Sequence, residues 1–106
     1  MDAQLKKGLL DSLVLAALLE EDGYGYSLSE RIGQVVSIAE TALYPVLRRL
    51  EEQGSLSTYA VEHGGRLRKY YRITPEGRAR LLEGADELRE LRKLIDGILE
   101  EVEGNG

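Results

Sequence analysis

The chain has 106 residues, the length of one small domain with at most one appended element. It contains no cysteine and a single histidine, so disulfides are excluded and no metal site is expected. The longest purely apolar run, residues 13–19, is far shorter than the roughly 18 residues of a membrane span. The start of the chain also lacks the basic residues of a signal peptide, so a cytoplasmic protein outside the membrane is expected.

The net charge of −5 is distributed unevenly along the chain. Residues 1–30 carry two lysines against six acidic residues, and residues 81–106 carry three basic against eight acidic residues. Residues 31–80 instead carry nine basic against five acidic residues. A local basic surface matters more for DNA binding than the total charge, and an acidic remainder reduces non-specific affinity. The distribution therefore permits a site-specific DNA-binding protein.

Residues 5–20 are predicted to form a helix whose apolar side chains, Leu9 and Leu13 among them, cover more than one face. A helix that is apolar on several sides is buried, here both in its own domain and against a partner. Glycine turn chemistry in the segment Asp22-Gly23-Tyr24-Gly25 is expected to end this helix.

Two segments, Ser27–Glu30 and Ser37–Glu40, match the S-x-x-E capping box that begins a helix. They predict a short helix, a tight turn and a second helix over residues 38–53, which Gly54 closes. Pro45 lies inside the second helix and removes a backbone hydrogen bond. The helix is therefore expected either to bend or to begin later than the capping box indicates; a bend is favoured because the apolar stripe continues in phase.

Residues 56–62 and 66–73 are predicted to form a β-hairpin that turns at His63-Gly64-Gly65. Alternation along the second strand predicts an inward set of Leu67, Tyr71 and Ile73, from which Lys69 near the tip is excepted. The outward set is Arg66, Arg68, Tyr70 and Arg72. Two capped helices followed by a basic hairpin predict a winged helix-turn-helix, a mostly α-helical fold with a small β-hairpin. Such a fold places one helix in a groove of DNA.

Thr74, Pro75 and Glu76 are typical of a helix start, and the helix is predicted to run to about Glu103. Its apolar residues recur at spacings of 7, 3, 4, 3 and 4, as in a coiled-coil seam: Leu81, Leu88, Leu91, Ile95, Ile98, Val102. The seam has no partner within the chain, so residues 75–106 are expected to form a homodimer. Residues 1–74 contain the predicted winged helix-turn-helix and are expected to bind DNA. The predicted dimer interface consists of Leu9, Leu13, Leu88, Leu91, Ile95, Ile98 and Val102.

These segments together resemble the PadR family of transcriptional regulators, in particular its short members with a single C-terminal helix. The resemblance rests on Gly23-Tyr24-Gly25-Tyr26, on the segment TALYPVLRRLE over residues 41–51, and on RLRKYYRIT over residues 66–74. It implies a homodimer with interlocking C-terminal helices that binds a pseudo-palindromic operator and usually represses. It implies no cofactor, and it accounts for the proline inside the predicted recognition helix.

The resemblance also implies a small-molecule effector, because many relatives sense small and often aromatic compounds. Some bind them in a dimer-interface cavity flanked by aromatic residues of the last helix. Residues 75–106 of this chain contain no aromatic residue. An effector pocket between the first and last helices would therefore be lined by aliphatic side chains, and stacking of a flat aromatic ligand is not expected.

The predicted DNA-binding residues lie at the second helix and in the hairpin: Ser37, Ala39, Glu40, Thr41, Tyr44, Arg48, Arg49, Arg66, Arg68 and Lys69. Arginine can reach a phosphate or a guanine edge, and Thr41 and Tyr44 a phosphate or a thymine methyl group. Three alternatives stay open. Glu40 is either a helix cap, which is favoured, or a contact to cytosine; Arg49 either binds DNA or pairs with Glu52. The hairpin cations either bind DNA or protect a sheet edge.

No serine, histidine and acidic residue are spaced like a nucleophile with its base, and no glycine-rich phosphate loop is present, so enzymatic activity is not expected. One alternative function is a winged helix used for protein–protein contact. Loss of DNA binding at moderate salt, with the dimer intact, would favour it. A metal sensor on a similar fold is disfavoured by the absence of cysteine and the single histidine.

Overall fold

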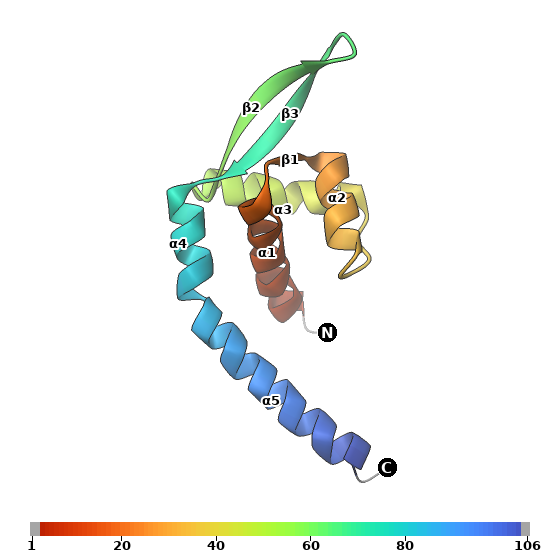
Figure 1. Cartoon of the computed structure of the whole chain (residues 1–106), viewed down its shortest axis with the longest axis vertical. Helices are drawn as coiled ribbons and strands as arrows, with labels where there is room; N and C mark the ends of the chain where they lie inside the picture. The colour runs from red at the N-terminus through yellow and green to blue at the C-terminus, as the bar shows by residue number, and fades with distance from the viewer. Residues whose placement is uncertain (1–2, 105–106) are drawn as a thin grey trace.

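The computed structural model describes residues 3–104 (Figure 1). Three helices at the N-terminal end pack together below a small antiparallel sheet, a fourth helix packs against the first, and the last helix leads away from them. The elements are α1 (Ala3–Glu20), β1 (Gly23–Tyr24), α2 (Gly25–Gly33), α3 (Glu40–Glu52), β2 (Leu56–His63), β3 (Arg66–Ile73), α4 (Pro75–Glu83) and α5 (Ala85–Gly104). The predicted helical fold with a small β-hairpin is confirmed.

The hairpin forms with the predicted strands, and its register runs from Leu56 opposite Ile73 to His63 opposite Arg66. Its turn contains only Gly64 and Gly65, because His63 is still paired. Both glycines have positive φ angles, 59° and 81°, as a two-residue type I′ turn requires. The sheet also contains β1, which pairs with β3 and was not predicted from the sequence.

The end of α1 differs from the prediction, because neither Gly23 nor Gly25 has a positive φ angle. Arg31 instead binds carbonyl groups in the last turn of the helix and just after it: its guanidinium donates to the backbone oxygens of Ala17, Glu21 and Asp22 at 2.9–3.1 Å. A Cβ atom on Gly23 would overlap this guanidinium. Gly23 is therefore required for close approach rather than for turn geometry, and a cation satisfies the exposed acceptors at the helix end.

Both predicted capping boxes are wrong. Helix α2 begins at Gly25, and Ser27 lies within it, where its Oγ accepts from the Tyr24 amide and donates to the Tyr24 carbonyl, both at 3.0 Å. Helix α3 begins at Glu40, with Ala39 as an N-cap that has no side-chain hydrogen bond. The connection before it, which contains the exposed Ser37, is not helical because Ile38 there packs against the core. Helix α3 therefore begins later than the capping box indicates, which is one of the two outcomes expected from the position of Pro45.

The hydrophobic core joins α1, α2, α3 and the sheet. The predicted apolar stripe of α3 is buried in it except for Ala39, which is exposed at the N-cap. The full set of buried apolar residues is Val14, Leu15, Leu18, Leu28, Ile32, Leu43, Val46, Leu47, Leu50, Leu56 and Tyr71. Helix α3 closes as predicted at Gly54, which has a φ angle of 78°. The Ser55 amide then donates to the Leu50 carbonyl at 2.9 Å, as in a Schellman motif.

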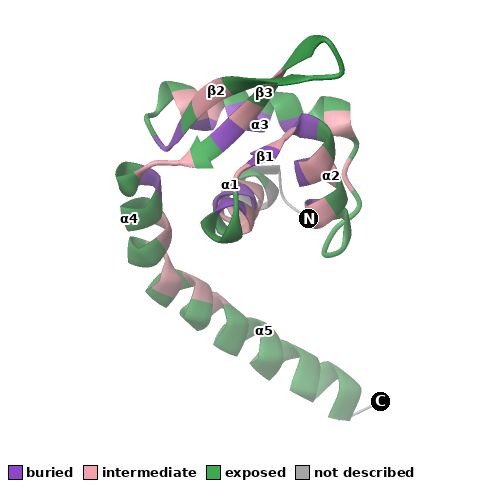
Figure 2. Cartoon of the chain, turned by 45° about the horizontal axis from the view of Figure 1, so that its top comes forward, coloured by how far each residue is buried: buried purple, intermediate pink, exposed green. Residues whose placement is uncertain are grey.

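The C-terminal segment begins as predicted, since Thr74 Oγ1 accepts from the Gly77 amide at 3.0 Å. It is not one helix, because α4 and α5 meet at Gly84, where the chain changes direction (Figure 1). Helix α4 belongs to the body of the protein: Gly77 is buried and Leu81 packs against the core. Helix α5 leads away from the body and has no buried residue, so the molecule reaches 59 Å in its longest dimension (Figure 2).

No helix within residues 3–104 is both long enough and apolar enough to cross a membrane.

Candidate nucleic-acid interface

The outer face of α3 is exposed and polar, as the sequence predicts. Thr41, Tyr44 and Arg48 all lie on it, while Leu43 and Leu47 of the same helix are fully buried. No side-chain hydrogen bond or ion pair among the described residues engages Thr41 or Arg48. The helix is therefore fixed by its inner face and presents free hydrogen-bonding groups on its outer face.

Glu40 and Tyr44 form a pair on this outer face. The Tyr44 hydroxyl donates to Glu40 Oε1 at 2.6 Å, so the Glu40 side chain is not a helix cap. This hydrogen bond to a carboxylate raises the pKa of Tyr44, because an ionised phenol would lose the bond and face a second negative charge. Tyr44 therefore stays protonated as a donor at neutral pH.

Arg49 does not lie on the outer face and does not pair with Glu52. It forms an ion pair with Asp11 of α1, and about a quarter of each side chain remains exposed (27% and 25%). The pair joins residues 38 positions apart, so no local sequence pattern indicates it. Arg49 therefore joins α3 to α1, and we do not retain it as a DNA-binding residue.

The hairpin carries exposed basic residues toward its tip. Arg66 is exposed, and no hydrogen bond or ion pair with residues 7–104, the part of the chain with described side chains, engages its side chain. The predicted inward set holds near the base, where Tyr71 is 6% exposed, but not at the tip, where Leu67 is 76% exposed. The reason is that the tip projects beyond the helices (Figure 1). Lys69 turns toward α3, where its Nζ lies 3.5 Å from Glu51 Oε1.

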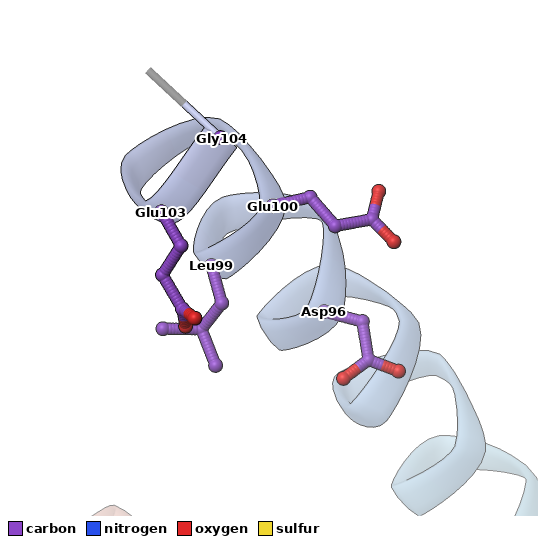
Figure 3. A pocket seen from close by; sticks show the side chains of 5 residues that line it. All are labelled: Asp96, Leu99, Glu100, Glu103 and Gly104. Carbon is purple, nitrogen blue, oxygen red and sulfur yellow. The ribbon is translucent and has the colours of Figure 1, made fainter. Parts of the chain in front are cut away.

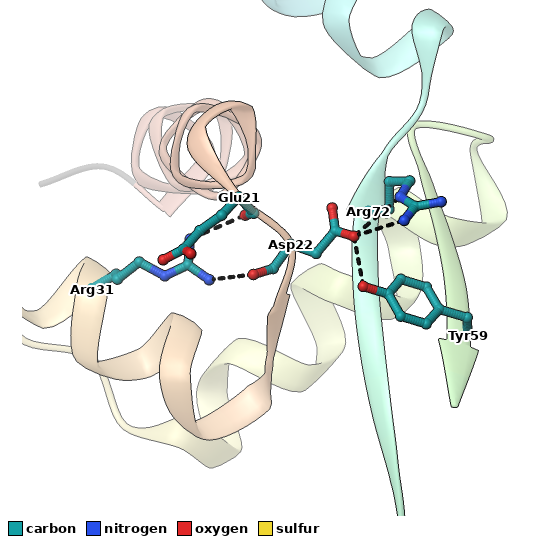
Figure 4. A network of polar contacts seen from close by, with 5 residues as sticks. All are labelled: Glu21, Asp22, Arg31, Tyr59 and Arg72. Carbon is teal, nitrogen blue, oxygen red and sulfur yellow. Dashed lines mark hydrogen bonds and ion pairs between the residues drawn. The ribbon is translucent and has the colours of Figure 1, made fainter. Parts of the chain in front are cut away.

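Asp22 fixes the base of the hairpin to the end of α1 (Figure 4). Its Oδ2 atom accepts from the Tyr59 hydroxyl at 2.6 Å and lies 3.0 Å from Arg72 Nη2. The hydrogen bond to the carboxylate raises the pKa of Tyr59. Arg72 is neutralised here, and its partner lies 50 residues earlier in the chain, so the sequence offered no signal for the contact.

Stacked tyrosines extend this anchor along the hairpin. The Tyr59 and Tyr70 rings stack with centroids 5.5 Å apart, and Tyr24 meets Tyr70 edge-on at the same distance. The Arg68 guanidinium lies 4.1 Å from the centroid of the Tyr24 ring, an attractive cation–π geometry. The Arg68 side chain is therefore half-buried against Tyr24 at the start of α2, whereas the Arg66 side chain is exposed.

The outer half of α5 exposes an apolar stripe: Ile95 is 44% exposed, Ile98 55% and Val102 65%. Nearer the body, Leu88 and Leu91 are half-buried and line a groove of about 340 Å³ against Leu9 of α1. Figure 3 shows carboxylates near the end of the helix, on Asp96, Glu100 and Glu103. Like charges four residues apart and acids in a last turn both destabilise an isolated helix.

The arrangement of a helix-turn-helix with an exposed recognition helix, followed by a hairpin with a basic tip, defines a winged-helix protein. Comparison with known families makes the assignment more specific. The Transcriptional regulator PadR-like family matches residues 14–83. The chain therefore belongs to the PadR-like family, whose members are transcriptional regulators and not enzymes.

Related proteins agree with this assignment. The transcriptional regulator Rv3488 of Mycobacterium tuberculosis is 41% identical over 69 residues, which cover 65% of this chain and 64% of that protein. The crystal structure of a PadR family transcriptional regulator from Eggerthella lenta is 38% identical, with a TM-score of 0.78 over 92% of this chain and 87% of that one. A transcriptional regulator from Clostridium thermocellum is 34% identical, with a TM-score of 0.79 over 92% and 96%.

Proposed function

We propose that this protein is a sequence-specific DNA-binding regulator that acts as a homodimer on a pseudo-palindromic operator. The observation that carries the proposal is the outer face of α3, which is exposed, polar and free of internal partners at Thr41 and Arg48. A hairpin with a free arginine at its tip follows in the place of a wing. The family resemblance supports repression as the effect of binding.

Within this proposal, α3 enters the major groove and the hairpin tip contacts phosphates or the minor groove. Arg48 and Arg66 are the strongest candidates, because both are exposed and no described side chain of residues 7–104 pairs with them. Glu40 is also a proposed contact, because the Tyr44 hydroxyl engages only one of its carboxylate oxygens. The remaining proposed contacts are weaker, since they are small, paired or half-buried: Ser37, Ala39, Thr41, Tyr44, Arg68 and Lys69.

The homodimer is proposed because α5 has an apolar stripe and no neighbour along its outer half among the described residues. A second copy would cover the stripe and stabilise α5, whose carboxylates near the C-terminal end repel one another. Residues 1–74 would then bind DNA and residues 75–106 would join the two copies, with α4 also packed on its own domain. The proposed interface consists of Leu9, Leu13, Leu88, Leu91, Ile95, Ile98 and Val102.

An effector would act through the groove between α1 and α5. Its residues are mostly small or aliphatic, and none is aromatic: Gly8, Leu9, Ser12, Gly84, Glu87, Leu88 and Leu91. We propose that a small aliphatic ligand here would bind weakly and by shape. It would change the distance between the two recognition helices of the dimer and so release the operator.

Selection from random DNA duplexes tests the proposed function. A two-fold dimer presents two identical recognition helices, so the enriched sequence should be an inverted repeat. Half-site centres should lie roughly 10 bp apart, or a multiple of it, for both helices to meet the same face of the duplex. Enrichment of a single half-site bound by one monomer would contradict the dimeric mechanism. Absence of binding at moderate salt, with the dimer intact, would support a protein–protein module instead.

The recognition helix and the wing should respond differently to substitution. Arg48→Ala should weaken binding to the selected operator by about 1–3 kcal/mol and affect random DNA less, because a base contact is lost. Arg66→Ala should weaken both DNAs alike and reduce the salt dependence by roughly one counterion per lost contact. Fluorescence anisotropy titrations at several salt concentrations measure both effects. Equal losses on operator and random DNA for Arg48→Ala would count against base reading by α3.

A further inference from the structure

Glu40 is a carboxylate placed at the first turn of the proposed recognition helix. It is the first residue of α3 and lies beside Thr41 and Tyr44. Its Oε1 atom accepts from the Tyr44 hydroxyl at 2.6 Å, and no hydrogen bond from residues 7–104, whose side chains the structure describes, engages its Oε2 atom. The side chain is not used in capping the helix, so one of its oxygens is available to a ligand.

Close packing holds this carboxylate in place. The ring of Tyr44 lies directly against Gly25 at the start of α2, where a Cβ atom would come within 2.5 Å of the Tyr44 hydroxyl and 2.9 Å of its ring carbons. The start of α2 therefore restricts one side of the Tyr44 ring, which is 41% exposed, and Tyr44 in turn holds Glu40 Oε1 through its hydrogen bond. A side chain held in this way loses little conformational entropy when it binds.

The chemistry of DNA limits what such a group can contact. A carboxylate only accepts hydrogen bonds, and it repels phosphates. In the major groove the donors are the N4 amino group of cytosine and the N6 amino group of adenine. Adenine places its N7 acceptor next to N6, where it would face the lone pairs of the carboxylate, whereas cytosine has no acceptor beside N4. A fixed glutamate on this face therefore selects cytosine.

We propose that Glu40 determines specificity for one C·G pair in each half-site, with Oε2 accepting from cytosine N4 while Tyr44 holds Oε1. The inference rests on the proposed function, because it requires α3 to enter the major groove. Its position fits that role, since residues at the N-terminal end of a recognition helix are those that contact base edges. Where no cytosine is in reach, the same carboxylate lowers affinity by repelling the phosphates.

The test compares the wild-type protein with Glu40→Gln on the operator selected by the wild type and on duplexes that carry each other base at each half-site position. The wild type should prefer cytosine at one position by roughly 5-fold to 100-fold. Glu40→Gln should lose this preference and shift toward adenine at the same position, because glutamine pairs with adenine N6 and N7. Preferences at the other positions should not change.

Two further variants separate base reading from charge and from folding. Glu52→Gln removes the same charge from the exposed far end of α3, so it should raise affinity for all DNA and leave every base preference unchanged. Tyr44→Phe keeps the ring against Gly25 but loses the hydrogen bond, so it should weaken the cytosine preference. If Glu40→Gln binds DNA with the wild-type preference at every position, the inference is wrong and the proposed function stands. If the wild type prefers no sequence, the proposed function fails and this inference fails with it.

Discussion

Replacing Ile95 and Ile98 of α5 together by aspartate is expected to convert the proposed dimer into monomers. Both side chains lie on the exposed apolar stripe, which a second copy would bury. Loss of one buried isoleucine side chain costs about 2–5 kcal/mol in a packed core, and burial of an unpaired carboxylate adds further cost. Because the monomeric α5 makes few contacts of its own, the helix is also expected to unfold in part.

Sedimentation velocity and circular dichroism measure these two effects. Lys93→Asp is the matched control, since it adds an acidic group to the same exposed helix two residues before the stripe residue Ile95 but off the stripe, and it should leave the dimer intact. A folded dimer in the double variant would show that the stripe of α5 is not the interface. The apolar face of α1 that includes Leu9 and Leu13 would then be the next candidate.

Gly77→Ala is expected to be the most destabilising of the small substitutions in the winged-helix body. Gly77 is buried at the third position of α4, where a Cβ atom would overlap the carbonyl oxygen of Ser55. That carbonyl also accepts from the Thr74 amide at 3.0 Å, and it is backbone, so it has little freedom to move away. Overpacking costs about 1–3 kcal/mol, and this position should lie at the upper end.

For a domain of this size such a loss lowers the melting temperature by roughly 10–20 °C, which calorimetry measures directly. Gly97→Ala provides the matched control, because no atom lies within 4 Å of the corresponding Cβ position in α5. Alanine is favoured over glycine within a helix by about 0.5–1 kcal/mol, so this variant should be slightly stabilised. An unchanged melting temperature for Gly77→Ala would mean that α4 does not approach Ser55 as described.

The features that the sequence predicted correctly depend on residues that are close together in the chain. The buried stripe of α3, its closure at Gly54, the start of α4 at Thr74 and the hairpin strands are each set by side-chain spacing or by the backbone preference of single residues. The same holds for the exposed face of Thr41, Tyr44 and Arg48, because a polar stripe opposite an apolar one is fixed by helical periodicity.

The features that the sequence predicted wrongly depend on contacts between residues that are distant in the chain. Tyr24 caps α2 because β1 pairs with β3, and this contact overrides the local preference for a start at Ser27. Ile38 reaches the core only if the chain before α3 is not helical, so the capping box at Ser37 does not form. Gly84 fits the spacing of the helical seam, yet α4 ends there, so α4 stays on the body while α5 leaves it.

The sequence alone therefore determined the helix-turn-helix, the hairpin and the position of the polar recognition face, because each is specified by local periodicity and turn chemistry. Only the tertiary structure decided which polar residues on and around that face are free. Arg49 pairs with Asp11, and Arg72 pairs with Asp22. These pairs join residues that are 38 and 50 positions apart, so they exist only once folding has brought these segments together.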